Sequence, residues 1–305
     1  MGELFAPSEV PIVLKRIAPA VFVVLWSTGF IVARYGSQDA GPLTFLTVRT
    51  AISALILWVV ARFVKEPRLR RPQINVQVLS GLGIHAMYLG GVWVAIDHGL
   101  PSGISALIAA LHPVVTTVLS RVLLGEVLTR RRTIGVLLGF IGVIAVVIEH
   151  GGAGDGVTGF AIGAMAIAVA GMSAGTLVQR KFAAGTPLLS GTAIQYLATT
   201  IALGILAFSW EGWQFQITAR SMFSLAWSII ILSVAAILIM LWLLHQQAAV
   251  QVSSLFFLTP ALSTIEGALL FHEQLHALAI VGLLIAVVGV WLATTTPQSI
   301  TSRQK

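Results

Sequence analysis

The sequence repeats itself at an offset of 147 residues, without a gap across the best-matched stretch. A proline, a glutamate and two glycines recur in register, so that Pro113, Glu126, Gly135 and Gly142 correspond to Pro260, Glu273, Gly282 and Gly289. Each copy contains five hydrophobic segments, and an odd number of spans makes the second copy enter a membrane upside down relative to the first. The repeat therefore predicts two inverted five-helix halves, residues 1–150 and 151–305, an arrangement typical of secondary transporters.

The composition of the chain indicates a polytopic membrane protein embedded in a lipid bilayer. Of its 305 residues, 57% are hydrophobic and 10% are charged, whereas about 25% are charged in an average soluble domain. The absence of cysteine excludes disulfides and thiolate chemistry. The net charge of +7 does not indicate a nucleic-acid partner, because the basic residues lie in short loops between apolar runs.

Ten segments are long enough to cross the hydrocarbon core, which needs about 20 apolar residues. They fall near residues 14–33, 42–64, 75–96, 102–124, 132–149, 158–178, 187–208, 222–243, 249–271 and 277–296. The connections between them are short. The predicted fold class is therefore an all-α integral membrane protein with ten transmembrane helices.

The basic residues are distributed unevenly between the two sets of loops, and Lys and Arg in short loops mark the cytoplasmic side. Fifteen of the eighteen fall on the side of the N-terminus, Arg34 and Arg220 fall on the other, and Arg49 lies within a span. This bias predicts a multi-pass protein with both termini in the cytoplasm.

The chain resembles the drug/metabolite transporter superfamily, in particular its EamA-type ten-span exporters. The resemblance rests on Trp26-Ser27-Thr28-Gly29-Phe30, on Pro42 and Arg49, and on the doubled unit of a proline, a glutamate and a glycine-spaced helix. The second copy departs from the family pattern, since His272 replaces the glycine seen at Gly125. The resemblance implies a bacterial inner-membrane exporter of amino acids or related metabolites, with a central cavity between the two repeats.

Arg49 lies seven residues past Pro42, too deep in its span to reach the membrane surface easily. A charged residue inside a bilayer usually faces the protein interior or a cavity. Arg49 is either an anchor for a substrate carboxylate, which guanidinium binds through two hydrogen bonds, or a structural donor to neighbouring carbonyls. Its counterpart in the second copy is near Gln195, so the charge is not symmetric.

Two polar stripes occupy related positions in the two copies. Thr259, Ser263 and Glu266 share one helix face, and the corresponding residues of the fourth span are His112, Thr116 and Leu119. Pro113 and Pro260 lie beside these stripes and free backbone carbonyls. The stripes are either a cavity wall or hydrogen bonds that hold helices together. The asymmetric positions, Arg49 and Glu266, are where we expect substrate selectivity to lie.

Two further pairs are candidates for substrate binding. His85 and Tyr88 are three residues apart on the third span, and Trp26 and Phe30 are four residues apart on the first. Such aromatic pairs can stack on an amphipathic solute, and the polar atoms of His85 and Tyr88 can hydrogen-bond to it. The alternative for each is a packing role.

Two motifs suggest chemistry that other features of the sequence argue against. His272-Glu273-Gln274-Leu275-His276 fits the zinc-protease pattern, but Glu273 corresponds to Glu126, which no histidine flanks. The glycine run at 151–156 lacks the Lys-Ser/Thr ending of a phosphate loop. We therefore expect no metal, no cofactor and no enzymatic activity.

The sequence thus predicts an alternating-access carrier that exports small amphipathic metabolites, most of all amino acids including aromatic ones. Substrate would bind near the midplane between spans three and four and spans eight and nine. The alternatives are a sugar or nucleotide-sugar carrier of the same superfamily, a channel, and an intramembrane zinc hydrolase. A monomer or a weak homodimer fits the repeat, since one chain already supplies both halves.

Overall fold

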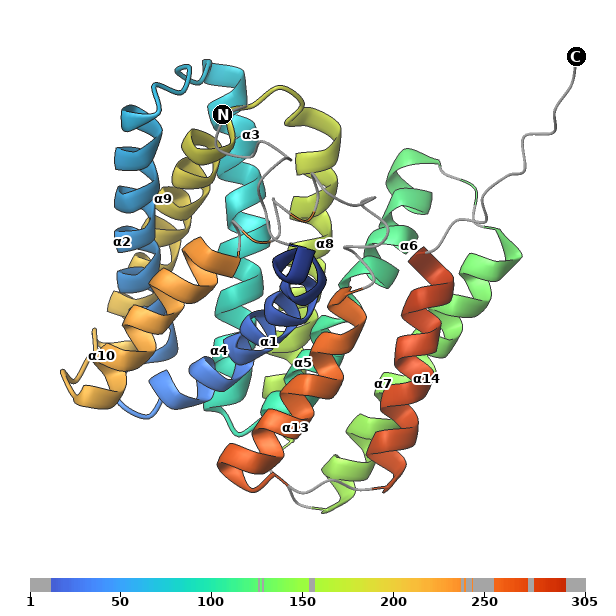
Figure 1. The fold of residues 1–305 in the computed structure, drawn as a ribbon. Coiled ribbons are helices and arrows are strands. Elements are labelled where there is room, and N and C mark those ends of the chain that lie inside the picture. The colour runs from blue at the N-terminus through green and yellow to red at the C-terminus, as the bar shows by residue number, and fades with distance from the viewer. Residues whose placement is uncertain are drawn as a thin grey trace, which may run out of the picture.

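The computed structural model describes residues 12–125, 127, 129–153, 157–236, 239, 243, 255–273 and 277–294. Regular structure in these ranges is helical, apart from one isolated backbone bridge between Ala40 and Phe215. Seven spans of the described part are long and apolar enough to cross a membrane, and two shorter apolar helices, Ala219–Ala235 and Ile280–Thr294, accompany them. The predicted all-α membrane fold is confirmed (Figure 1).

The first predicted half contains the helices α1 Ile12–Gly36, α2 Pro42–Phe63, α3 Arg71–Gly81, η1 Leu82–Met87, α4 Tyr88–Asp97, α5 Ser102–Ala109, α6 His112–Leu124 and α7 Arg130–Ala153. The second contains α8 Gly159–Phe182, α9 Leu188–Leu206, η2 Ala207–Glu211, α10 Ala219–Ala226, η3 Trp227–Ala235, η4 Phe256–Leu258, α13 Thr259–Phe271 and α14 Ala277–Thr294. Parts of the predicted spans 222–243 and 249–271 lie outside the described residues. The division at residue 150 stays a prediction, and α7 continues three residues beyond it.

Helices α7 and α14 form a close pair at one side of the molecule (Figure 1). Glycines bring the two backbones together: a Cβ atom on Gly289 would lie 2.2 Å from the amide nitrogen of Gly139 and 2.8 Å from the carbonyl oxygen of Gly135. The repeat-related contact is equally tight, since a Cβ atom on Gly142 would lie 2.5 Å from the carbonyl oxygen of Gly282. Small residues at a helix interface are what allow such close approach in a membrane.

Helices α2 and α9 form a second pair at the opposite side of the molecule (Figure 1). The first amide groups of α2 have no partner within their own helix. The Glu211 carboxylate, at the end of η2, accepts hydrogen bonds from the amides of Leu43 and Thr44 at 2.8 Å each, and from the Thr44 hydroxyl at 2.7 Å. A carboxylate at a helix N-terminus also interacts favourably with the helix dipole.

The start of α9 is capped in the same way by Glu66, just beyond the end of α2. Its carboxylate accepts from the amides of Leu189 and Ser190 at 3.1 and 2.8 Å, and from the Ser190 hydroxyl at 2.8 Å. Glu66 and Glu211 are 145 residues apart, the offset that also relates Pro42 to Pro187. Each helix of the pair is therefore capped by a glutamate that follows its partner.

The main hydrophobic core includes buried residues from most of the helices, those of α2 and α4 among them. Trp93 is almost fully buried, and its ring stacks on Phe45 with 4.6 Å between centroids. A smaller apolar cluster surrounds Phe22 and Leu243.

Candidate functional site

Two π-helical segments occupy related positions in the two copies. η1 spans Leu82–Met87 in the third span, and η3 spans Trp227–Ala235 in the eighth. π-helical turns cost hydrogen-bond quality and occur frequently at functional sites. Each segment carries a polar side chain that meets a residue from a neighbouring span, namely His85 in η1 and Ser233 in η3.

His85 lies in a buried group of polar side chains. Its Nε2 is 3.0 Å from Oε1 of Gln195, and the Gln195 amide nitrogen donates to Oε1 of Gln77 at 2.5 Å and of Gln179 at 2.9 Å. The His85 ring also contacts the ring of Tyr196, with 4.5 Å between centroids. Since Gln195 accepts at its Oε1, the geometry favours a proton on Nε2 of His85.

Arg49 is buried, with only 6% of its surface exposed. Its Nη2 donates to the Ser233 hydroxyl at 3.4 Å, and its Nε has no hydrogen-bond partner. Among the described residues no carboxylate forms a salt bridge with it. Arg49 interacts electrostatically with both Tyr196 and His85. Because Arg49 also contacts Ser233 of η3, the polar side chains of η1 and η3 lie near each other.

The two halves of this region are related but not alike. Gln195, near the counterpart of Arg49, reaches from the seventh span to His85 in η1, just as Arg49 reaches from the second span to Ser233 in η3. The amide group of Gln195 is fully engaged, whereas the guanidinium of Arg49 is not. The sequence predicted that the charge of Arg49 has no symmetric counterpart. In the structure this asymmetry means that Arg49 has a free hydrogen-bond donor, whereas the side-chain amide of Gln195 has none.

Glu266, Ser263 and Thr259 lie on α13, against α1. The Ser27 hydroxyl donates to Oε1 of Glu266 at 2.7 Å, and the Ser263 hydroxyl donates to the carbonyl of Ser27 at 3.1 Å. Oε2 of Glu266 and the hydroxyl of Thr259 are buried and have no partner. This stripe therefore joins α13 to α1 and also contains an acceptor, Oε2 of Glu266, and a hydroxyl, that of Thr259, without hydrogen-bond partners.

His112 and Thr116 lie on α6, against α8. Pro113 has no amide hydrogen to donate to the carbonyl of Ala109, and His112 Nδ1 lies 3.2 Å from that oxygen. The carbonyl of His112 accepts from the hydroxyls of Thr116 at 2.7 Å and of Ser173 at 2.9 Å. Of these hydrogen bonds, the one from Ser173 joins α6 to α8, whereas the other two lie within the fourth span. Nε2 of His112 is the ring atom left for a ligand.

The aromatic residues proposed for substrate binding lie in different parts of the structure. Trp26 packs with Phe22 and Phe256, at centroid distances of 5.4 and 5.1 Å, whereas Phe30 is buried in the main core. Tyr88 is half-buried and packs against the main core. The structure therefore brings Arg49 and His85 together and places Trp26, Phe30 and the two stripes in other surroundings.

Several residues of this region were not predicted from the sequence, namely Gln77, Gln179, Tyr196, Trp227 and Ser233. Trp227 belongs to η3 and donates from Nε1 to the Thr28 hydroxyl at 3.0 Å. Gln195 was noticed only as the counterpart of Arg49. Polar residues inside apolar spans are the signal that finds Gln77, Gln179 and Ser233, and nothing in the spacing finds Tyr196.

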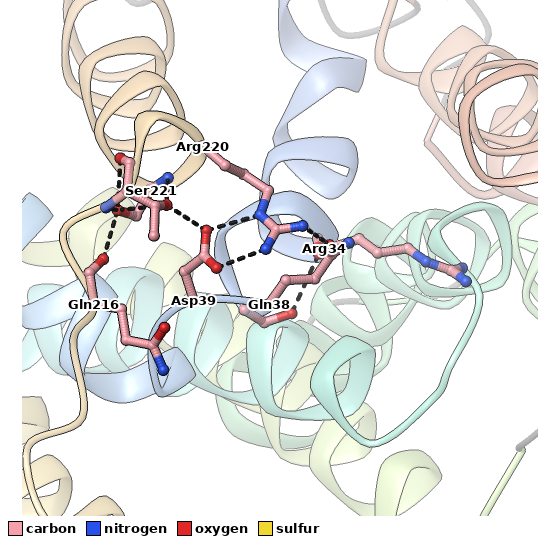
Figure 2. A network of polar contacts seen from close by, with 8 residues as sticks. Arg34, Gln38, Asp39, Gln216, Arg220 and Ser221 are labelled. Carbon is pink, nitrogen blue, oxygen red and sulfur yellow. Dashed lines mark hydrogen bonds and ion pairs between the residues drawn. The ribbon is translucent and has the colours of Figure 1, made fainter.

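A partly buried ion pair joins the two predicted halves at the predicted outer face, the end of the bundle that carries the 36–41 and 211–218 loops. Asp39 accepts from Nε of Arg220 at 2.7 Å, from Nη2 at 2.6 Å and from the Thr218 hydroxyl at 2.6 Å (Figure 2). The Arg220 guanidinium and the Thr218 hydroxyl lower the pKa of Asp39 from 3.8 to about 2. In the same view the guanidinium of Arg34 points away from this network.

Arg34 instead forms a salt bridge with Glu273. The Glu273 carboxylate also accepts from the amides of Ser102 and Gly103, at 2.9 and 3.4 Å, at the start of α5. Helix α13 ends at Phe271, and His272 has a left-handed φ of 56°, as Gly125 has at 68°.

The zinc-protease pattern therefore does not lie on one helix, since α13 ends at Phe271. Its glutamate, Glu273, instead accepts hydrogen bonds from Arg34 and from the amides at the start of α5. His276 lies outside the described residues, and within those residues no cluster of three metal-ligating side chains occurs.

Comparison with known proteins gives one family. The EamA-like transporter family model matches residues 17–148 and 159–295. A solved crystal structure, 18% identical, aligns with a TM-score of 0.64 over 91% of this chain and 95% of its own, which shows a shared fold.

Relatives are named as transporters. The uncharacterized transporter YvbV of Bacillus subtilis is 26% identical over 281 residues, 90% of each chain. The uncharacterized inner membrane transporter YedA of Escherichia coli is 29% identical over 186 residues, 60% of this chain and 58% of that protein. A probable amino-acid metabolite efflux pump of Salmonella typhimurium is 26% identical over 128 residues, 41% of this chain and 40% of the pump.

Proposed function

Because this chain belongs to the EamA-like transporter family, we propose that it is a secondary transporter that exports amino acids, aromatic ones among them, or related small metabolites. The membrane would be the bacterial inner membrane, with both termini in the cytoplasm. The bias of basic residues supports this orientation. The names of YedA and of the Salmonella efflux pump agree with the membrane and with the substrate class.

The observation that carries the proposal is the buried guanidinium of Arg49. A charge inside a membrane protein is retained where it serves function, and its usual partner is an opposite charge. In the described part of the chain Arg49 has only a 3.4 Å contact with Ser233, and its Nε is unpaired. A substrate carboxylate supplies the missing acceptor, since it can take hydrogen bonds from two nitrogens of one guanidinium.

The rest of the substrate would lie against His85 and Tyr196. The centroids of these two rings are 4.5 Å apart, and both side chains interact electrostatically with Arg49. Two tilted rings with polar edges suit an amphipathic or aromatic side chain. Glu266, with Oε2 unpaired, and Thr259 are the residues proposed to meet the polar end of a substrate from the other half.

Transport would proceed by rocking of the two halves around this region. The glycine contacts between α7 and α14 and the paired caps of α2 and α9 hold helices that come from different halves. The Asp39–Arg220 and Arg34–Glu273 pairs join the halves at the predicted outer face. In an outward-open state we expect these two ion pairs to separate.

The test is uptake of labelled amino acids and sugars into proteoliposomes that contain the purified full-length chain. We expect saturable uptake of at least one amino acid. Arg49→Gln should lower this uptake about 10-fold to 100-fold, the loss expected for a hydrogen bond to a charged group. The matched control is Thr50→Val, because the Thr50 hydroxyl already bonds to the Leu46 carbonyl and to Thr200.

A panel in which sugars move and no amino acid does would contradict the proposed substrate class. Uptake that is the same in wild type and Arg49→Gln would remove Arg49 from the binding site. In either case, size-exclusion chromatography of each variant shows whether the protein is folded.

A further inference from the structure

Four residues of the second and eighth spans form a group that we name the serine–arginine cluster: Arg49, Ser53, Ser228 and Ser233. We infer that this cluster binds the carboxylate of an organic acid, with the hydroxyls of Ser53 and Ser228 as donors beside the guanidinium. The inference rests on the proposed function and extends it, because it adds Ser53 and Ser228 to the site and defines the acidic group of the substrate.

The cluster follows from the geometry of two packed helices. Arg49 and Ser53 are four residues apart on α2 and therefore share a face. Ser228 and Ser233 are five residues apart, a spacing that a π-helix places on one face and an α-helix does not. Helix α2 packs against η3, and the hydrogen bond from Arg49 to the Ser233 hydroxyl joins the two faces.

Two of the three hydroxyls of this cluster differ from their neighbours, whereas the Ser233 hydroxyl donates to the carbonyl of Ser228 at 3.0 Å. On the same helix, Thr47 and Thr50 donate to the carbonyls four residues earlier, at 2.7 and 2.8 Å, as buried hydroxyls in helices usually do. The hydroxyls of Ser53 and Ser228 are buried without any partner, as is Nε of Arg49. Ser53, Ser228 and Arg49 are 1%, 0% and 6% exposed.

Unpartnered buried polar groups are uncommon in folded proteins and call for an explanation. A ligand that accepts hydrogen bonds would supply the partner that these groups lack.

The chemistry of the cluster selects an anion. The side chains offer an N–H and hydroxyl groups as donors, and none of the four carries a carboxylate that would attract a cation. A carboxylate has two oxygens and accepts several hydrogen bonds, whereas a neutral amide has one such oxygen. The cluster should therefore separate acids from their amides.

The repeat-related position, on the seventh span in the second copy, does not provide a second site of this kind. There Gln195 replaces the charge, and its amide group is engaged with His85, Gln77 and Gln179. The structure thus predicts one carboxylate per transported molecule and a fixed orientation of the substrate relative to the two halves.

The test measures binding to the purified full-length chain by its unfolding temperature in detergent. The probes are two pairs that differ at the carboxylate, phenylacetate with phenylacetamide and L-phenylalanine with L-phenylalaninamide. At least one acid should stabilise the wild type while its amide does not. Arg49→Gln, Ser53→Ala and Ser228→Ala should each weaken the binding of that acid about 10-fold or more, and Thr50→Val should leave it unchanged.

A second measurement separates a ligand-binding role from a structural one. Without ligand, Ser53→Ala and Ser228→Ala should unfold at the wild-type temperature or above it, because each removes a hydroxyl that has no partner. A lower temperature in both variants would mean that these hydroxyls hold the protein together through water.

Three results would overturn the inference: no acid binds in preference to its amide, the serine variants bind the acid as the wild type does, or both serine variants are destabilised. The proposed transport function is judged separately by the proteoliposome assay. Selective acid binding that the serines determine, together with no amino-acid flux, would keep the cluster and reject the amino-acid substrate.

Discussion

Replacing Gly289 with alanine tests the contact between the two predicted halves most sharply. The added Cβ atom would lie 2.2 Å from the amide nitrogen of Gly139 and 2.8 Å from the carbonyl oxygen of Gly135. Ordinary contacts between heavy atoms begin at about 3.5 Å, so α7 and α14 would have to separate locally by about 1 Å. Both neighbours are backbone atoms of a helix and cannot turn away as a side chain can.

The expected cost follows from two opposing effects. Overpacking of a tight interface costs about 1–3 kcal/mol, while alanine is favoured over glycine in a helix by up to about 1 kcal/mol. With the full gain, the net loss in the free energy of unfolding should be about 0–2 kcal/mol relative to the wild type, and about 1–3 kcal/mol relative to a glycine-to-alanine change without the clash. Gly142→Ala, on the repeat-related contact, should lose a similar amount because its Cβ would lie 2.5 Å from the Gly282 carbonyl oxygen.

The matched control is Gly163→Ala in α8, where an added Cβ atom has nothing within 4 Å. It carries the helix-propensity gain without the clash, so it should unfold at or above the wild-type temperature. Tryptophan fluorescence during heating in detergent gives the order of the variants. Gly289→Ala unfolding at the same temperature as Gly163→Ala would refute the reasoning.

The other predictions concern charges and backbone conformation. Glu66→Gln and Glu211→Gln should each cost about 1–2 kcal/mol, and the double variant should lose the sum because the two caps are at opposite ends of the helix pair; a non-additive result in thermal unfolding contradicts independent caps. The lowered pKa of Asp39 means that its ion pair stabilises the fold above pH 3.8 and is lost as the pH falls toward about 2; the difference in unfolding temperature between wild type and Asp39→Asn should vanish across that window, and a difference unchanged at pH 2 opposes this. His272→Gly should stabilise the protein by about 1 kcal/mol, since φ is left-handed there, and a marked loss in a melting experiment would show that the imidazole contributes to folding.

The spans were predictable because they depend on composition alone. A run of apolar residues identifies a helix in a bilayer, and proline and glycine in register identify the repeat. His272, in the place of the glycine seen at Gly125, departs from the family pattern, but both residues adopt left-handed φ values, 56° and 68°. The backbone conformation is thus kept although the residue that favours it is not.

The site was predictable only in part. The depth of Arg49 follows from its distance to Pro42, but its partner Ser233 lies 184 residues away, and periodicity says nothing about such contacts. The π-helical segments could not be predicted either, because an α-helical periodicity places Ser228 and Ser233 on different faces. The caps at Glu66 and Glu211 could have been predicted, because these two glutamates are related by the same offset of 145 residues as Pro42 and Pro187.

The central claim is that this protein is a carrier whose two halves alternate around one carboxylate-binding region. Counterflow in proteoliposomes tests it most directly, with labelled L-phenylalanine outside and either unlabelled L-phenylalanine or L-phenylalaninamide inside. The account predicts that internal phenylalanine accelerates entry of the label, that internal amide does not, and that Arg49→Gln abolishes the acceleration. Entry that rises linearly with concentration and ignores the internal solute would indicate a channel and contradict the account.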